Sequence, residues 1–206
     1  MAEQKSAGRT ARKMADWTEL SYAVVDVEGN GHQPPDLVEL AAVPIIGGVI
    51  GEPMSWLIRP DQAITPMAQR VHGISNKAVA DAPLFADIKD DVLKALGVSA
   101  FVAHNAHVDA NVLRRKMPGW TCPEVFDTLK LARRFVPDQM SFRLGSLVEA
   151  LQLAEGLPHD MRPHRAGYDA LVTARLFVQL ATVAGSLEEL RGLPPEGGTD
   201  ETPALF

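Results

Sequence analysis

The sequence predicts one α/β domain with a mixed five-stranded sheet flanked by helices. Three strand-like stretches come first and are joined by short turns, which is typical of antiparallel strands. Two further strand-like stretches then alternate with segments whose apolar residues recur at helical spacing, which is typical of parallel strands. The chain has 206 residues, which is enough for one well-buried domain and short for two of ordinary size.

Each predicted strand is a short run rich in β-branched and apolar residues, bounded by turn residues. Gly47-Gly48 separates the second run from the third as a hairpin-like turn. Pro44 lies inside the second run and cannot donate to a sheet ladder, so we expect a bulge or an end of regular pairing there. The five runs are 22–26, 37–46, 50–58, 99–104 and 125–127.

The predicted helices are marked by their ends as well as by apolar periodicity. Thr65-Pro66 is typical of a cap followed by proline at the first helical position, and Gly73 is typical of a helix stop. Residues 84–96 place apolar side chains at helical spacing, and we expect that face to pack on the sheet. The six predicted helices are 66–72, 84–96, 108–116, 128–135, 144–151 and 168–184.

The two ends of the chain are predicted to be flexible. Residues 1–19 are basic at first and lack the apolar core of roughly 7 to 15 residues that a secretion signal needs. The chain from Gly192 onward is rich in proline and glycine and poor in apolar residues. We therefore expect a flexible lead-in at 1–19, the domain at 20–185 and a flexible tail at 186–206.

Composition predicts a soluble cytoplasmic protein. No apolar run reaches the roughly 18 residues needed to cross a bilayer, so no membrane partner is expected. The single cysteine, Cys122, cannot form an internal disulfide and has no Cys or His nearby at metal-ligand spacing. Such cysteine usage fits a reducing compartment.

Charge is spread unevenly along the chain. The formal net charge is −6, which argues against a broad electrostatic grip on long duplex DNA. Residues 111–165 hold nine Lys/Arg against six Asp/Glu, a local +3, and the rest of the chain therefore sums to −9. If nucleic acid binds, we expect this segment to carry the contacts, although an ordinary solvated surface explains the charge equally well.

Two carboxylates stand at the end of the first predicted strand. Asp26 and Glu28 have one residue between them, so in extended backbone their side chains lie on the same face. Such a pair can form a hard-oxygen metal site. Taken alone it is weak evidence, because acids are common where strands end.

Further candidates follow later in the chain. Asp109 begins the helix after the fourth strand, where a helix dipole alone would also favour an acid. His164 and Asp169 are five residues apart and would face different ways on one helix. We therefore expect His164 to lie in a loop, hinged by Gly167, so that it can share a site with Asp169. Four acids and a histidine at the ends of strands and helices together predict chemistry.

These clusters resemble the DEDDh exonucleases, the RNase H-like family that includes the proofreading subunit of bacterial replicative polymerases. The matching motifs occur in the family's order over residues 20–183. They are Asp26-Val27-Glu28, His72-Gly73-Ile74-Ser75, the His-Asn-Ala-x-x-Asp block at 104–109, the segment at 127–133 and the His-x-Ala-x-x-Asp-Ala block at 164–170.

The resemblance implies an RNase H-like fold and a site with two Mg²⁺ or Mn²⁺ ions. Asp26, Glu28 and Asp169 would bind the first ion. Asp26 would bridge to a second ion, held also by Asp109. His164 would be the general base that takes a proton from the attacking water, which suits a group that titrates near neutrality.

The segment after the first motif departs from the family pattern. Members usually continue as Asp-x-Glu-Thr-Thr-Gly-Leu, and these neighbours hold the terminal 3′ nucleotide. This chain has Gly29, Asn30, Gly31 and His32 instead, and the run Gly29-Asn30-Gly31 also favours a tight turn. The chemistry is therefore better predicted than the substrate. By the resemblance, the candidate substrate-binding residues are Val27, Gly29, Asn30, His32, His104 and Asn105. The last two would either support the residues that hold the metals or position a nucleotide, and would not be metal ligands themselves.

Three functions remain open from the sequence. The first is a 3′→5′ exonuclease that releases nucleoside 5′-monophosphates from single-stranded DNA or short oligonucleotides. The second is a phosphohydrolase of the same fold that acts on a small nucleotide or dinucleotide. The third is a nucleic-acid-binding or polymerase-binding module without catalysis. All five catalytic residue types are present, which argues against the third, and a polymerase partner is possible but no feature indicates one.

Overall fold

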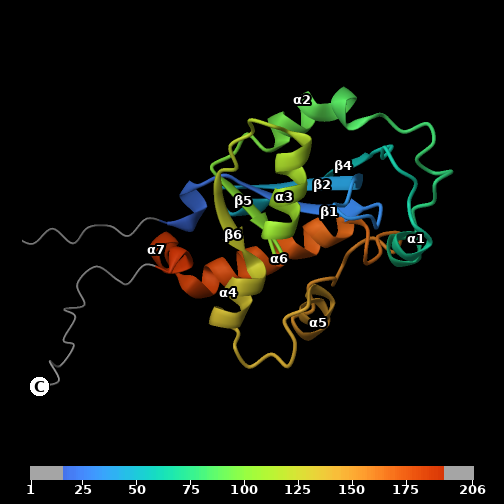
Figure 1. The fold of residues 1–206 in the computed structure, drawn as a ribbon. Coiled ribbons are helices and arrows are strands. Elements are labelled where there is room, and N and C mark those ends of the chain that lie inside the picture. The colour runs from blue at the N-terminus through green and yellow to red at the C-terminus, as the bar shows by residue number, and fades with distance from the viewer. Residues whose placement is uncertain (1–15, 193–206) are drawn as a thin grey trace, which may run out of the picture.

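The computed structural model describes residues 16–192, which form a twisted sheet with helices on both faces (Figure 1). The sheet order is β3-β2-β1-β5-β6, and β4 also pairs with β2. β1 pairs antiparallel with β2 and parallel with β5, and β5 pairs parallel with β6. The strands are β1 (Tyr22–Gly29), β2 (Leu37–Ile46), β3 (Val49–Ile50), β4 (Met54–Leu57), β5 (Ala100–Ala103) and β6 (Glu124–Asp127).

The mixed α/β class is confirmed, but the sheet has six strands where five were predicted. The difference lies in the third predicted strand, 50–58, which the structure divides into β3 and β4. β3 pairs with the end of β2 and β4 pairs with its middle, so both lie on the same outer edge of β2. Gly51-Glu52-Pro53 separates them and interrupts the ladder.

Pro44 explains where that interruption falls. β2 continues through Pro44 and stays paired with β1 opposite Ala23, so the pairing with β1 does not end as expected. The carbonyl of Pro44 accepts a hydrogen bond of 2.8 Å from the amide of Gly51, so its backbone polar groups face the outer edge. The N–H that proline lacks would have pointed away from β1, so the β1–β2 ladder loses no hydrogen bond. The hydrogen bond is missing on the outer edge of β2, between β3 and β4.

The helices lie close to their predicted positions. In α1 the Thr65 side chain accepts the amide of Ala68 at 3.2 Å, and Gly73 ends the helix in the left-handed conformation at φ 74°. Both predicted end signals are confirmed. The helices are a 3-10 turn η1 (Trp17–Glu19), α1 (Pro66–His72), α2 (Phe85–Ala95), α3 (His107–Lys116), α4 (Thr128–Phe135), α5 (Leu144–Ala150), α6 (Ala166–Ala184) and α7 (Leu187–Arg191).

The alternation of side chains along β1 divides the core into two layers. Tyr22 and Val24 point into the layer beneath α6, where the rings of Tyr22 and Phe177 lie 4.8 Å apart. Ala23 and Val25 point into the opposite layer, which α2 and α3 cover. The even-numbered residues of β1 therefore face α6, and this parity carries on to Asp26 and Glu28.

The packed domain extends beyond its predicted limits of 20 and 185. Trp17 is buried against the α6 layer, and Leu187 and Leu190 of α7 are buried in the same layer. These apolar contacts explain why residues 16–19 and 186–192 are ordered parts of the fold. The rest of the two segments that were predicted to be flexible lies outside the described residues. Among residues 16–192, the helices are too short or too polar for a membrane span.

Candidate active site

The site is built at the end of β1. β1 runs parallel to β5, so the carboxyl ends of both strands lie at the same edge of the sheet. Asp26 and Glu28 end β1 there, and α3 follows β5 at the same edge, bringing Asp109 in its first turn. The start of α6 brings Asp169, also in a first turn. Three segments that are distant in sequence thus place four carboxylates at one edge.

Glu28, His164 and Asp169 form the tightest group. One ligand atom from each lies within 4.8 Å of the others. The amide of His164 donates to Asp169 Oδ2 at 2.9 Å, which ties the histidine loop to the first turn of α6. The ring of His164 is exposed, whereas Glu28 and Asp169 are partly buried. The predicted proximity of His164 to Asp169 is confirmed.

His164 lies in a loop as expected, but Gly167 is not the hinge. α6 already begins at Ala166, and the backbone turns at His164 itself, which has φ 60°. Gly167 serves close packing: a Cβ there would lie 2.9 Å from Ser55 Oγ on β4. The hinge prediction is therefore wrong, because the glycine is needed for the approach of α6 to the sheet.

The carboxylates raise one another's proton affinity. Burial first, then the charges of Asp109, Asp169, Glu28 and Glu39, hold the pKa of Asp26 well above its usual range. Burial, together with Asp169 and Glu39, raises the pKa of Glu28 to about 8. Burial raises the pKa of Asp169 to about 6, although His164 opposes the rise. In Asp109, 5% exposed, burial raises the pKa to about 7 against hydrogen bonds from the amides of Asp109 and Val27.

This electrostatic arrangement fits a divalent cation. Carboxylate oxygens are hard ligands, and like charges held this close are costly without a compensating positive charge. Among the described residues, the ion pair next to the cluster joins Glu39 and Arg165. Asp26, Glu28 and Asp169 form no ion pair there with a lysine or arginine. The donor set therefore suits a divalent cation that prefers oxygen ligands.

Sequence reasoning missed the pair Glu39 and Arg165. Arg165 Nε donates to Glu39 Oε2 at 2.9 Å and its Nη2 contacts Oε1, while the amide of Ala166 donates to the same Oε2 at 2.9 Å. Glu39 is 5% exposed and lies opposite Glu28 in the β1–β2 ladder. The available signal was an acid inside an otherwise apolar predicted strand, followed by an arginine directly after His164.

Asn30 and His32, two of the predicted substrate-binding residues, use their side chains for hydrogen bonds to backbone groups of the protein. Asn30 is 1% exposed, and its Oδ1 accepts the amides of His32 at 3.2 Å and Asp36 at 3.0 Å. Its Nδ2 donates to the carbonyl of Gln62 at 3.3 Å. His32 Nε2 lies 3.0 Å from the carbonyl of Ala63. These contacts favour a structural role for Asn30 over direct contact with substrate, because each of its side-chain polar atoms already has a protein partner.

His104 is likewise engaged by the protein. Its Nδ1 lies 2.9 Å from Thr128 Oγ1 and its Nε2 lies 2.9 Å from the carbonyl of Phe142. The ring, which directly follows β5, thus contacts α4 and the segment before α5 through both nitrogens, as expected of a supporting group; a role in positioning a nucleotide stays a prediction. Asn105 has φ 69°, and its amide donates to Asp127 Oδ1 at 3.1 Å.

Gly29 and Val27 complete the predicted substrate-binding set. Gly29 is the last residue of β1, opposite Leu37, after a register shift at Glu28/Gly29. It is therefore a strand residue, and the turn expected at 29–31 starts only at Asn30. A Cβ at Gly29 would lie 3.2 Å from Pro35 Cβ. Val27 packs against the α2–α3 layer.

Comparisons with known proteins identify the family of this chain. A family model described as Exonuclease matches residues 23–177, three quarters of the chain, a range that includes the five candidate catalytic residues. The chain belongs to this exonuclease family. The assignment confirms the resemblance to the DEDDh exonucleases.

Exodeoxyribonuclease 10 of Escherichia coli (strain K12) is 38% identical to this exonuclease over 163 residues, which are 79% of this chain and 69% of that protein. The 3'-5' exonuclease DinG of Bacillus subtilis (strain 168) is 36% identical over 180 residues, 84% of this chain. This exonuclease spans only 18% of that relative's length.

A solved structure of Exonuclease X in complex with 5′ overhanging duplex DNA covers 80% of this chain and 93% of its own, with a TM-score of 0.67 and 35% identity. The zinc-bound E. coli ExoI–ssDNA complex has a TM-score of 0.66 at 20% identity and covers 79% of this chain and 40% of its own. That second likeness shows the fold alone. The RNase H-like architecture is thus shared with solved exonucleases.

Proposed function

We propose that the protein is a two-metal-ion 3′→5′ exonuclease that hydrolyses phosphodiester bonds of single-stranded DNA or short oligonucleotides to nucleoside 5′-monophosphates. The observation that carries the proposal is the grouping of Glu28, His164 and Asp169 within 4.8 Å, beside Asp26 and Asp109. A basic side chain next to clustered carboxylates is the arrangement that metal-assisted hydrolysis requires.

The carboxylates would hold the metals. Asp26, Glu28 and Asp169 are proposed for one Mg²⁺ or Mn²⁺ ion, and Asp26 with Asp109 for a second. When bound, such ions lower the pKa of a coordinated water and neutralise charge at the scissile phosphate. Asp26 suits the shared position because its carboxyl senses the charges of Asp109, Asp169 and Glu28 together.

His164 supplies the proton acceptor. Its exposed ring can exchange protons with solvent. The hydrogen bond that its backbone amide donates to Asp169 Oδ2 fixes the backbone from which the ring projects. The neighbouring carboxylate of Asp169 stabilises the imidazolium that forms when the ring takes a proton. Glu39 and Arg165 hold the chain on the other side of His164, and so act as positioning residues.

The substrate is proposed from the relatives and from the site. Exonuclease X and ExoI were solved with DNA, as their names state. The loop at 30–36 is held by Asn30 and by an ion pair between Lys116 and Asp36, so a nucleotide has to bind against a preformed wall. The second candidate, a phosphohydrolase for a nucleotide or dinucleotide, draws support from the absent Thr-Thr-Gly-Leu grip and the net charge of −6. A cytoplasmic location belongs to the proposal.

One assay separates the candidates. Purified protein with Mn²⁺ is given a 5′-labelled oligonucleotide of about 20 nucleotides, a dinucleotide and mononucleotides, with EDTA and Mg²⁺ as parallel arms. Stepwise shortening of the long strand with release of 5′-monophosphates supports the exonuclease. Turnover of the dinucleotide alone would select the second candidate, and metal-independent retention of DNA without any hydrolysis would select a binding module.

A further inference from the structure

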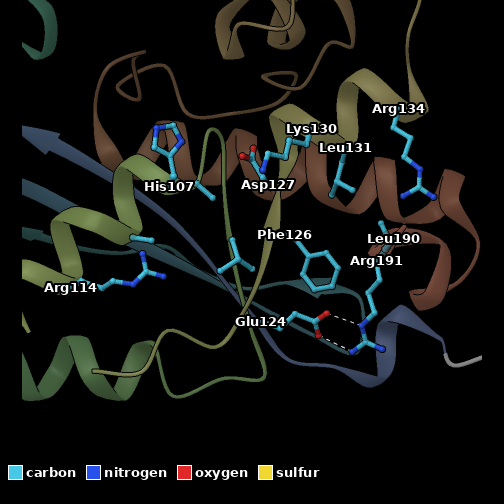
Figure 2. Close-up of a pocket in the computed structure, with 13 residues that line it drawn as sticks. His107, Arg114, Glu124, Phe126, Asp127, Lys130, Leu131, Arg134, Leu190 and Arg191 are labelled. Carbon is cyan, nitrogen blue, oxygen red and sulfur yellow. Dashed lines mark hydrogen bonds and ion pairs between the residues drawn. The ribbon is translucent and has the colours of Figure 1, made fainter. Parts of the chain in front are cut away.

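A groove of about 600 Å³ lies between α3 and α4, over the outer edge of β6 (Figure 2). β6 is the last strand in the sheet order, so within residues 16–192 its outer edge has no strand partner. Val125 is 42% exposed there, and the groove is also lined by Ala106 before α3, Ala110 of α3 and Leu131 of α4. The groove therefore has a smooth apolar floor between two helices.

Cationic side chains rise around this floor. Arg114 projects from α3, and Lys130 and Arg134 project from α4 (Figure 2). All three are exposed, and in the described part of the chain none has a carboxylate within ion-pair distance. Arg191 at the far end is instead paired twice with Glu124, at 2.7 Å each. Within residues 16–192, three cationic side chains that form no ion pair thus line the groove, in a protein whose net charge is negative.

The groove begins beside the candidate active site. Ala106 and His107 line it in the first turn of α3, two to three residues before Asp109. One residue on a helix turns the side chain by about 100°, so Asp109 and Ala110 occupy neighbouring faces of α3. Asp127 lines the groove and also accepts the amide of Asn105, which joins β5 to α3. A strand whose 3′ end lies at the carboxylates reaches the groove by crossing the start of α3.

We propose that this groove binds the sugar–phosphate backbone of the substrate strand on the 5′ side of the nucleotide that is removed. The inference rests on the proposed exonuclease function and adds a second contact region to it. Cationic side chains spaced along a groove can contact successive phosphates of a strand, and such contacts do not depend on base identity. They also give the acidic protein a local means of attracting an anionic strand, through the segment 111–165 that carries the excess of positive charge.

A peptide is the competing occupant, because an open strand edge can also accept an added strand. Three observations favour nucleic acid. Four cationic side chains against the two carboxylates of Glu124 and Asp127 line the groove, cations stand on both of its walls, and it includes the start of the helix that carries Asp109. A strand-adding peptide needs the edge of β6, which is only four residues long.

The test compares a long substrate with one that cannot reach the groove. The double variant Lys130→Ala/Arg134→Ala is assayed on oligothymidylate of about 20 nucleotides and on the p-nitrophenyl ester of thymidine 5′-monophosphate. Lys89→Ala/Lys94→Ala on α2 is the matched control, because it removes the same charge from the opposite face of the sheet. Melting temperatures of all variants confirm folding.

We expect kcat/KM of the groove variant on the oligonucleotide to fall roughly tenfold at low salt, with ester turnover unchanged. The plot of log KM against log salt should flatten by about 0.7 per cation removed. Equal kinetics of groove and control variants on the long strand would overturn the proposal. Binding of a labelled peptide with the sequence of residues 194–206, lost on groove mutation while oligonucleotide kinetics stay unchanged, would assign the groove to an acidic peptide. If the unmodified protein hydrolyses neither substrate, the exonuclease function itself fails, which is a different result from a groove effect.

Discussion

The guanidinium of Arg165 and the carboxylate of Glu39 form a two-pronged ion pair between the start of α6 and the first residues of β2. The same carboxylate accepts the amide of Ala166, so β2 fixes the first turn of α6. Because His164 precedes this turn directly, its position depends on a buried acid 125 residues earlier in the chain.

Glu39→Gln should therefore lower kcat more than it raises KM. The side-chain oxygen of glutamine can still accept the amide of Ala166, but Arg165 loses its charge partner. Because Arg165 is partly exposed, we expect the loss in the free energy of unfolding to be limited to about 2 to 3 kcal/mol. Steady-state kinetics and urea unfolding measure both effects. Glu124→Gln, which breaks a more exposed arginine pair, should cost less than about 1 kcal/mol. Equal effects of the two variants would contradict a positioning role for Glu39.

Asp26→Asn should remove activity and stabilise the metal-free protein. The aspartate is held among carboxylates that raise its pKa, so replacing it with a neutral amide relieves repulsion. We expect a gain of about 1 kcal/mol in the free energy of unfolding in EDTA, together with loss of metal-dependent stabilisation. Asp90→Asn on the exposed side of α2 is the control and should change neither quantity. A destabilised apo variant would argue against electrostatic strain in the site.

The stability of the metal-free protein should fall as pH rises from about 4 to about 8. In the folded protein the pKa of Glu28 is raised to about 8, that of Asp109 to about 7 and that of Asp169 to about 6. Raised carboxyl pKa values mean that the folded state binds protons more tightly than the unfolded state. The stabilisation is complete below the unfolded pKa values and is lost as pH passes through the folded ones.

Thermal melts in EDTA and in Mn²⁺ at several pH values measure this dependence. Metal ligands must be deprotonated, so the stabilisation by Mn²⁺ should grow over the same range in which the apo protein weakens. The Asp26→Asn variant should show a shallower apo profile. A melting temperature in EDTA that is flat or rises between pH 5 and 8 would contradict the assignment of raised pKa values to the cluster.

Asn30→Ala should destabilise the fold without changing the affinity for a single nucleotide. The change deletes an acceptor used by His32 and Asp36 and a donor used by Gln62, all around a side chain that is 1% exposed. We expect a loss of about 2 to 3 kcal/mol in the free energy of unfolding. Gln33→Ala, exposed in the same loop, is the control. A raised inhibition constant for thymidine 5′-monophosphate at unchanged stability would instead restore Asn30 as a substrate contact.

The part of the site that depends on local pattern was predictable from sequence. The strand period places Asp26 and Glu28 on one face, and the helical period requires His164 to lie outside the helix of Asp169; both predictions agree with the structure. The helix ends at Thr65 and Gly73 were predictable for the same reason, because caps are decided by a few adjacent residues.

The rest depends on contacts between distant segments. The partner of Glu39 is 126 residues away, so its role could not be inferred from a strand pattern. Gly167 was taken for a hinge because glycine permits many conformations, whereas its constraint is Ser55 on another strand. The protein partners of Asn30 and His104, such as Gln62 and Phe142, are not visible in a motif, so the sequence could not say which contacts these side chains make.

The central claim is that the carboxylate cluster with His164 is a metal-dependent site that removes nucleotides from a 3′ end. The most direct measurement follows a 5′-labelled single strand in Mn²⁺ with the unmodified protein and with His164→Ala and Asp26→Asn. We predict stepwise shortening from the 3′ end, a loss of roughly 100-fold or more in kcat with His164→Ala, and no shortening with Asp26→Asn or in EDTA. Shortening at the same rate by either variant, or in EDTA, would contradict the account.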